Sequence, residues 1–180
     1  MAKLLYQGHA SLRITTEQNK VIYIDPYAGE GYQLPADMVL ITHEHYDHNG
    51  IHRIKLKENT VVIRAKDGLN GGIYRHFEYF GVSVTATPAQ HAKHDIRECM
   101  GYLVEVEGKK IYVAGDTDYV PFMEELAKED VDYALLPIDG IYNMGPEEAS
   151  RVAGIIKPKH LIPYHMKPGP LFDITMDLRV

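Results

Sequence analysis

The first third of the chain alternates short apolar runs with turns, and this pattern predicts β-strands. A helix is expected to open near Asn49. Gly68, Gly71 and Gly72 predict a loop with a short helix across 66–79. The strands predicted in this part are 3–7, 11–15, 21–24, 38–42 and 60–64.

The rest of the chain changes from strands alone to strands separated by helices. Pro121 is expected in the first turn of one helix, Pro146 opens a second, and Pro158 ends it. Strands followed by alternating strands and helices predict a layered α/β or α+β domain, and 180 residues are expected to form a single domain, 1–180. The later strands are predicted at 82–87, 101–106, 110–114, 131–137 and 160–163.

Composition excludes several classes of function. The net charge of −6, with scattered Lys and Arg, gives no basic stripe for nucleic acid, and no apolar run reaches the length of a membrane span. The N-terminus has no pattern of a secretory signal, and the single Cys99 is expected to pack in the core of a protein in the reducing cytoplasm. Nucleic acid and a membrane are therefore not expected as partners, and a homo-oligomer stays open.

The strongest local motif is Thr-His-Glu-His-Tyr-Asp-His-Asn-Gly at 42–50, directly after an apolar strand. Residues two apart in a strand point to one side, so His43, His45 and Asp47 can face a common point, and His48 can join them where the chain turns. Imidazole combined with carboxylate suits zinc, iron, nickel or manganese. The alternative is a solvated polar loop.

Three later residues also follow apolar strand patterns, namely His91, Asp116 and His165. Alone, each histidine is more typical of a surface or a hydrogen-bonded core position, and Asp116 of a turn. Their recurrence at strand ends favours a shared site, because ligands of open α/β sheets bind beyond the carboxyl ends of the strands. If the strands lie side by side in one sheet, these residues converge at one edge.

This order of motifs resembles the metallo-β-lactamase superfamily, over nearly the whole chain. Secondary features resemble its ascorbate-6-phosphate lactonase branch of small metal-dependent hydrolases. These features are Gly8-His9-Ala10-Ser11, Asp25-Pro26, Gly145-Pro146-Glu147-Glu148-Ala149 and Pro163-Tyr164-His165. The resemblance implies a four-layer αββα sandwich, two mixed sheets face to face with helices outside. Family members continue past the last ligand with a helix and a strand, whereas 172–180 has no assignable pattern, so a short C-terminal end is expected.

The resemblance also implies two divalent transition-metal ions, zinc foremost, with manganese, iron or nickel as alternatives. Asp116 would bridge them, and Asp47 and His9 are the candidate catalytic residues, with His9 at the mouth of the site. Asp25 either orients a ligand histidine or forms a simple Asp-Pro turn. The first ion would be bound by His43, His45 and His91, and the second by Asp47, His48 and His165.

The expected function is hydrolysis of an ester, lactone or phosphodiester bond of a small anionic substrate by a water activated by two metal ions. Lys167, or the group Lys93, His94 and Arg97, is expected to meet the anion. The alternatives are a di-iron redox protein and a metal-stabilised binding module without turnover. The resemblance argues against the redox protein, because those relatives usually have Glu at the position of His45 and carry a flavin domain.

Overall fold

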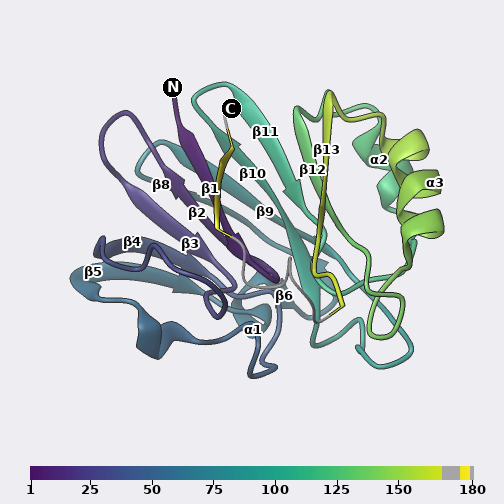
Figure 1. Ribbon diagram of the computed structural model, residues 1–180, viewed down its shortest axis with the longest axis horizontal. Coiled ribbons are helices and arrows are strands. Elements are labelled where there is room, and N and C mark those ends of the chain that lie inside the picture. The colour runs from purple at the N-terminus through teal and green to yellow at the C-terminus, as the bar shows by residue number, and fades with distance from the viewer. Residues whose placement is uncertain (168–174, 179–180) are drawn as a thin grey trace.

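The computed structural model describes residues 1–167 and 175–178, and two six-stranded sheets that face each other form its centre (Figure 1). The first sheet has the order β14-β1-β2-β3-β4-β5, in which β1, β3 and β4 run in one direction and β2 runs against them. Its strands are β1 (Lys3–Gly8), β2 (Ser11–Thr15), β3 (Val21–Ile24), β4 (Ala36–Leu40), β5 (Leu56–Ile63) and β14 (Met176–Leu178).

The second sheet repeats this arrangement. Its order is β13-β12-β11-β10-β9-β8, and β11, β12 and β13 are parallel, as β3, β4 and β5 are in the first sheet. Its strands are β8 (His76–Tyr79), β9 (Val82–Pro88), β10 (Met100–Val106), β11 (Lys109–Val113), β12 (Tyr133–Pro137) and β13 (His160–Tyr164).

Period-two alternation produces the core between the sheets. In β9, for example, Val82, Val84 and Ala86 are buried while Ser83 and Thr85 are partly exposed. Burying each large apolar side chain contributes about 1.5–3 kcal/mol. The inner faces of the two sheets share one continuous apolar cluster, so the sheets stabilise each other.

The outer faces of the two sheets are covered differently. Helices α2 (Met123–Leu126) and α3 (Pro146–Ile156) lie outside the second sheet, to the right in Figure 1. On the first sheet, Tyr32 and the 3₁₀ turn η1 (Ile51–Arg53) pack against the outer apolar cluster in place of an α-helix. The expected mixed α/β class with two mixed sheets face to face is confirmed, and the outer layer on the first sheet consists of loop and turn. No described helix is long and apolar enough to cross a membrane.

Some elements differ from the sequence prediction. The helix expected near Asn49 is only the turn η1. Segment 66–79 contains more strand than expected, because Gly71 and Gly72 adopt positive φ and close a small hairpin. From 172–180, the strand β14 pairs with β1, and residues 172–174 and 179–180 lie outside the described part. The elements between β5 and β9 are α1 (Ala65–Gly68), β6 (Leu69–Asn70), β7 (Ile73–Tyr74) and β8.

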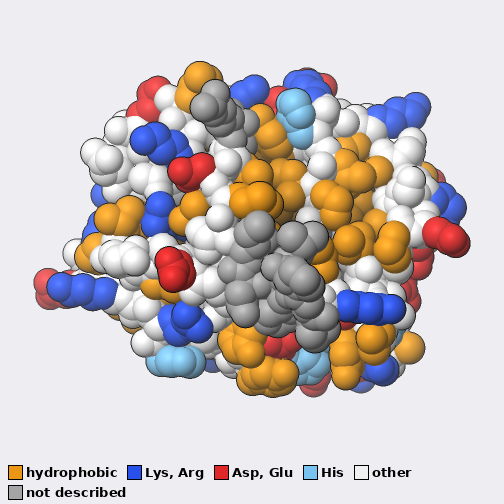
Figure 2. All heavy atoms as spheres, in the orientation of Figure 1, with side chains coloured by type: hydrophobic (Ala, Val, Ile, Leu, Met, Phe, Trp, Pro, Cys, Tyr) orange, Lys and Arg blue, Asp and Glu red, His pale blue; other side chains and the backbone are white. Residues whose placement is uncertain are grey.

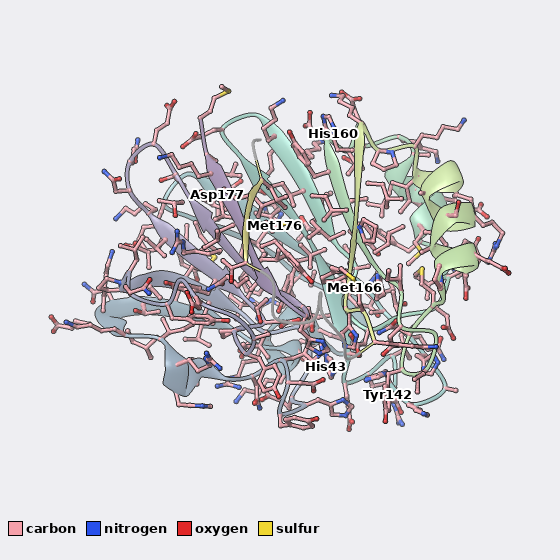
Figure 3. The ribbon with its side chains drawn as sticks, viewed as in Figure 1. His43, Tyr142, His160, Met166, Met176 and Asp177 are labelled. Atoms are coloured by element: carbon pink, nitrogen blue, oxygen red, sulfur yellow. The ribbon has the colours of Figure 1, made fainter. Side chains whose placement is uncertain are left out.

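The strand β13 forms one edge of the second sheet. Leu161 on this strand is 42% exposed, and apolar side chains gather over this part of the surface in Figure 2. His160 begins the strand, at the end of the molecule opposite His43 (Figure 3). The other end of β13 therefore leads towards His43.

In both sheets, an aspartate near the start of a parallel strand accepts hydrogen bonds from two neighbouring segments, an arrangement that we call a carboxylate brace. Asp37, just inside β4, accepts hydrogen bonds from Val21 N (2.9 Å) and Lys57 Nζ (2.6 Å). Asp132, just before β12, accepts them from Lys110 N (3.0 Å) and Lys159 Nζ (3.1 Å). Each brace fixes the start of a parallel strand whose far end leads to the cluster of histidines.

We predict that Asp37→Asn lowers the free energy of unfolding by about 1–2 kcal/mol at neutral pH. Burial alone would raise the pKa of Asp37, but Lys57 and Val21 N–H lower it overall. A carboxyl with a lowered folded-state pKa stabilises the fold above its unfolded value, near 3.9, and this stabilisation is lost as the pH falls through the folded value. The difference between the variant and the wild type should therefore shrink below about pH 4.

Urea titrations of metal-free protein at several pH values measure this difference. Glu58→Gln makes the same chemical change on an exposed side chain of β5 and should be nearly neutral. A difference between Asp37→Asn and the wild type that persists unchanged at low pH would contradict the assignment.

Candidate metal centre

The loop after β4 brings three histidines together. Asn49 N and His48 N each donate to His45 O at 3.1 Å, which turns the chain sharply after the strand. The ring centroid of His43 then lies 4.5 Å from that of His45 and 4.1 Å from that of His48. The loop therefore presents these imidazoles to a common region, as the spacing predicted.

Asp25 holds this loop from behind. It follows β3 with φ +45°, a conformation that non-glycine residues rarely adopt, and it is fully buried. Its carboxylate accepts hydrogen bonds from Thr42 N (2.8 Å) and Thr42 Oγ1 (2.6 Å). It also lies 2.8 Å from His48 Nδ1. Of the two interpretations of Asp25, the structure favours the one in which it orients a histidine.

The first group of potential ligands is His43, His45 and His94, whose ligand atoms all lie within 4.8 Å of one another. His94 Nε2 is 3.1 Å from His45 Nδ1. The sequence prediction named His91 for this group. His91 belongs to none of the groups found among the described residues, and its Nε2 instead lies 3.8 Å from Asp118 Oδ1.

A tight turn explains the difference between His91 and His94. The two residues exchange backbone hydrogen bonds, His91 N to His94 O (3.1 Å) and His94 N to His91 O (2.9 Å). His91 Nδ1 accepts a further bond from Lys93 N. The turn reverses the chain, so that the buried His94 ring, rather than His91, packs against His43 and His45.

The second group is His9, Asp47, His48 and His165. His9 Nε2 lies 3.0 Å from Asp47 Oδ2, and its ring centroid is 3.9 Å from that of His165. His165 N donates to His9 O at 2.8 Å. His9 is only 4% exposed, so the expectation that it lies at the mouth of the site is wrong: it is packed beneath Asp47 and His165.

Asp116 lies between the two groups. Its Oδ2 is 3.2 Å from His165 Nε2 and 3.5 Å from His94 Nε2, while its Oδ1 is 3.5 Å from His48 Nε2. Asp118, two residues on, faces His91 instead. The carboxylate of Asp116 therefore reaches histidines of both groups.

Gly115 is required for this placement of Asp116. Its φ is +72°, and a Cβ there would come 2.5 Å from Met100 O. Its N–H donates to Tyr164 Oη at 2.8 Å. This hydrogen bond links the segment after β11 to Tyr164, the last residue of β13, which immediately precedes His165.

The four strand-end residues do not come from one sheet. His43 follows β4 of the first sheet, whereas His91, Asp116 and His165 follow β9, β11 and β13 of the second. The strands run in the direction that brings their carboxyl ends to one rim of the sandwich, where His43 lies in Figure 3. The site is therefore built across two sheets, not along the edge of one.

Asp139 was not identified from the sequence. Its Oδ2 lies 3.4 Å from His165 Nδ1, and its Oδ1 accepts hydrogen bonds from Ile141 N and Tyr142 N. The residue follows the buried strand β12, so the rule that selected Asp116 could also have selected it. With Nδ1 of His165 beside Asp139, the Nε2 atom of the same ring lies next to Asp116.

The charges of the cluster favour a bound cation. Burial lowers the pKa of His43 to about 2, and His48 adds to this effect. Burial opposes ionisation of Asp116, but His48 and His165 outweigh it and lower the pKa of Asp116. Burial likewise lowers the pKa of His165, but Asp116 and Asp139 reverse this and raise it to about 10. Carboxylates that stabilise a buried imidazolium this strongly would also stabilise a metal ion.

Among the described residues, several buried ligand atoms form no hydrogen bond of acceptable geometry: His43 Nε2, His48 Nε2, His165 Nε2 and Asp116 Oδ1. Leaving a buried polar atom unsatisfied costs about 1–3 kcal/mol, so several such atoms pointing into one region need an explanation. Imidazole nitrogens and carboxylate oxygens are the atoms that zinc, iron, nickel and manganese bind. The donor set of this chain fits a transition-metal centre.

Comparison with known proteins agrees with this fit. The family model of the beta-lactamase superfamily domain matches residues 3–165. A UPF0173 metal-dependent hydrolase of Thermococcus onnurineus is 34% identical over 196 residues, covering 94% of this chain and 87% of that protein. The metallo hydrolase Igni18 of Ignicoccus hospitalis has a TM-score of 0.76 and 26% identity, covering 96% of this chain and 86% of Igni18.

The fold also occurs in CmlA, a diiron β-hydroxylase of Streptomyces venezuelae. The TM-score is 0.71 and the identity 17%, over 97% of this chain and 47% of CmlA, so this likeness concerns the fold alone. The chain belongs to the metallo-β-lactamase superfamily. Within it, the relatives that are 34% and 33% identical over 94% of this chain are named metal-dependent hydrolases, which confirms the expected enzyme class. The likeness to the ascorbate-6-phosphate lactonase branch stays a prediction.

The assignment of His94, rather than His91, to the first ligand group can be tested directly. We predict that His94→Ala binds less metal than the wild type, whereas His91→Ala binds as much, because His94 alone of the pair joins the group of His43 and His45. Metal content after equilibration with zinc and desalting gives the readout. Unchanged metal content in His94→Ala together with reduced metal content in His91→Ala would restore the ligand set implied by the sequence.

Proposed function

We propose that this enzyme hydrolyses an ester, lactone or phosphodiester bond of a small anionic substrate with two divalent metal ions, zinc foremost. In this proposal His43, His45 and His94 bind the first ion. Asp47, His48 and His165 bind the second, and Asp116 bridges them.

The observation that carries the proposal is the convergence of otherwise unsatisfied ligand atoms. His43, His48 and Asp116 form a third group within 4.8 Å that links the other two. Two cations about 3.5–4 Å apart repel each other, and an anionic bridge offsets this repulsion. Asp116, which reaches histidines of both groups, supports that role.

Bound at these positions, the ions would lower the pKa of a coordinated water to about 7 and polarise the substrate oxygen. The chain itself supplies the orientation of the ligands. Asp25 fixes His48, Asp139 faces His165, and His9 Nε2 lies against Asp47 Oδ2. Burial lowers the pKa of His9 despite the opposing effect of Asp47, so its imidazole is neutral at pH 7 and can donate its Nε2 proton to that carboxylate.

Asp47 and His9 are accordingly the proposed catalytic pair. The Asp47 carboxylate belongs to the second ligand group and is partly exposed, whereas His9 is buried. His9 would hold Asp47 in the orientation that the second metal position requires. A neutral histidine suits this role, because it satisfies one carboxylate oxygen without cancelling its charge.

A di-iron redox protein is the second candidate, and CmlA has the same fold. His45 lies in the first group together with His43 and His94, and a set of three histidines suits zinc as well as iron. The metal bound by the purified protein, together with its absorption spectrum, separates the two candidates. A chain that binds its metals but turns over none of the three substrate classes would instead be a metal-stabilised binding module.

We predict that Asp116→Asn, which keeps the shape of the side chain and removes its charge, weakens both metal positions and lowers kcat/KM by at least about 100-fold. Asp118→Asn is the matched control, because Asp118 faces His91 outside the three ligand groups. Zinc content and hydrolysis of a 4-nitrophenyl ester and of bis(4-nitrophenyl) phosphate measure the effect. Treatment of the wild type with a chelator should abolish both hydrolytic activities, and zinc should restore them.

Asp118→Asn with lost metal beside Asp116→Asn with both ions would place the bridge two residues further along the chain. Full hydrolysis by metal-free wild type would overturn the proposed function itself.

A further inference from the structure

A cavity of about 410 Å³ adjoins the first ligand group. His43, His45 and His94 form part of its wall, and its size is within the usual range of small-molecule sites. The remaining walls come from both sheets, since α1 follows β5 and the segment 93–99 lies between β9 and β10. A molecule in this cavity would contact the first metal position directly.

Two of the three acidic side chains that line the cavity are neutralised. Arg64 Nη1 donates to both carboxylate oxygens of Glu44, at 2.8 and 2.7 Å. Arg97 Nε donates to both carboxylate oxygens of Asp95, at 2.9 and 3.2 Å. The third, Glu98, is exposed to solvent.

The charges of two cationic side chains of the cavity are not neutralised in this way. Among the described residues, neither Lys66 nor Lys93 forms an ion pair with a carboxylate within 4 Å. The Lys93 ammonium lies 4.2 Å from the centroid of the Tyr142 ring. This contact leaves the ammonium protons available, because an aromatic face attracts the charge without accepting strong hydrogen bonds.

We propose that Lys66 and Lys93 bind an anionic group of the substrate, a carboxylate or a phosphate, that is separate from the bond to be hydrolysed. The inference rests on the proposed function and adds the position of the anion to it. Lys66 lies on α1, which follows β5 of the first sheet, and Lys93 lies in the loop after β9 of the second, so the anion would be held between segments of both sheets. The scissile bond would then lie at the wall formed by the three histidines.

This assignment reduces the set of residues that the sequence predicted to bind the anion. Arg97 is bound to Asp95, and His94 belongs to the ligand group. Lys167 does not line the cavity. Only Lys93 of the earlier candidates is kept, and Lys66 is added although it is far from Lys93 in the sequence.

Two 4-nitrophenyl esters test the proposal on the zinc-loaded enzyme. Mono(4-nitrophenyl) succinate carries a carboxylate where 4-nitrophenyl butanoate carries a methyl group. The wild type should prefer the succinate, after correction for uncatalysed hydrolysis. Lys66→Ala and Lys93→Ala should each reduce that preference about three- to tenfold, mainly through KM, and the double variant should reduce it further.

Lys55→Ala is the control, because it removes the same charge from an exposed lysine outside the cavity. It should leave the preference unchanged. Equal kcat/KM for the two esters in the wild type, or an equal loss for both esters in the double variant, overturns the inference while leaving the hydrolase proposal intact.

A binding measurement separates the inference from the proposed function. Calorimetric titration of the zinc-loaded wild type and of the double variant with N-phenylsuccinamate and with phenyl phosphate should show weaker binding to the variant for at least one of them. The more strongly affected compound identifies the anion as carboxylate or phosphate. Unchanged binding of both would mean that the anions bind the metal alone, and the inference would be wrong even if neither ester is hydrolysed.

Discussion

The buried carboxylate of Asp25 is the interaction on which the candidate metal centre depends. It receives the N–H and the hydroxyl group of Thr42 and faces His48 Nδ1, and so it fixes the start and the end of the ligand loop together. Thr42 O in turn accepts a hydrogen bond from Met100 N in the second sheet. One buried charge thus joins β3, the ligand loop and the opposite sheet, and it is stable there because each of its contacts comes from a polar group.

The same principle extends to the other histidines. An imidazole presents one nitrogen to a metal in a defined direction when a polar group fixes the position of its other nitrogen. Thr42 Oγ1 lies 3.0 Å from His43 Nδ1, and Asp139 faces His165 Nδ1. His9 and His165 also adopt left-handed backbone conformations, at φ +50° and +47°. Such strain persists where surrounding contacts fix the chain, and here those contacts define the site.

The sequence was sufficient to predict most strands and most of the clustered residues, because both follow from local patterns. Apolar alternation marks a strand, and a polar residue after a buried strand lies at a sheet edge. His91 and His94 are only three residues apart after the same strand, and the choice between them depends on a turn that no local pattern specifies. The division of the strand ends between two sheets depends on long-range packing, which also lies beyond local patterns. Asp139, by contrast, satisfied the strand-end rule and could have been found.

We propose that ligands from both sheets converge on two metal positions joined by Asp116. Anomalous diffraction from crystals of the zinc-loaded protein, measured on both sides of the zinc edge, is the decisive measurement. Two anomalous peaks are expected. One should lie within bonding distance of His43, His45 and His94, the other within bonding distance of Asp47, His48 and His165, with Asp116 between them. A first peak bound by His91 instead of His94, or the absence of any peak among these side chains, would contradict it.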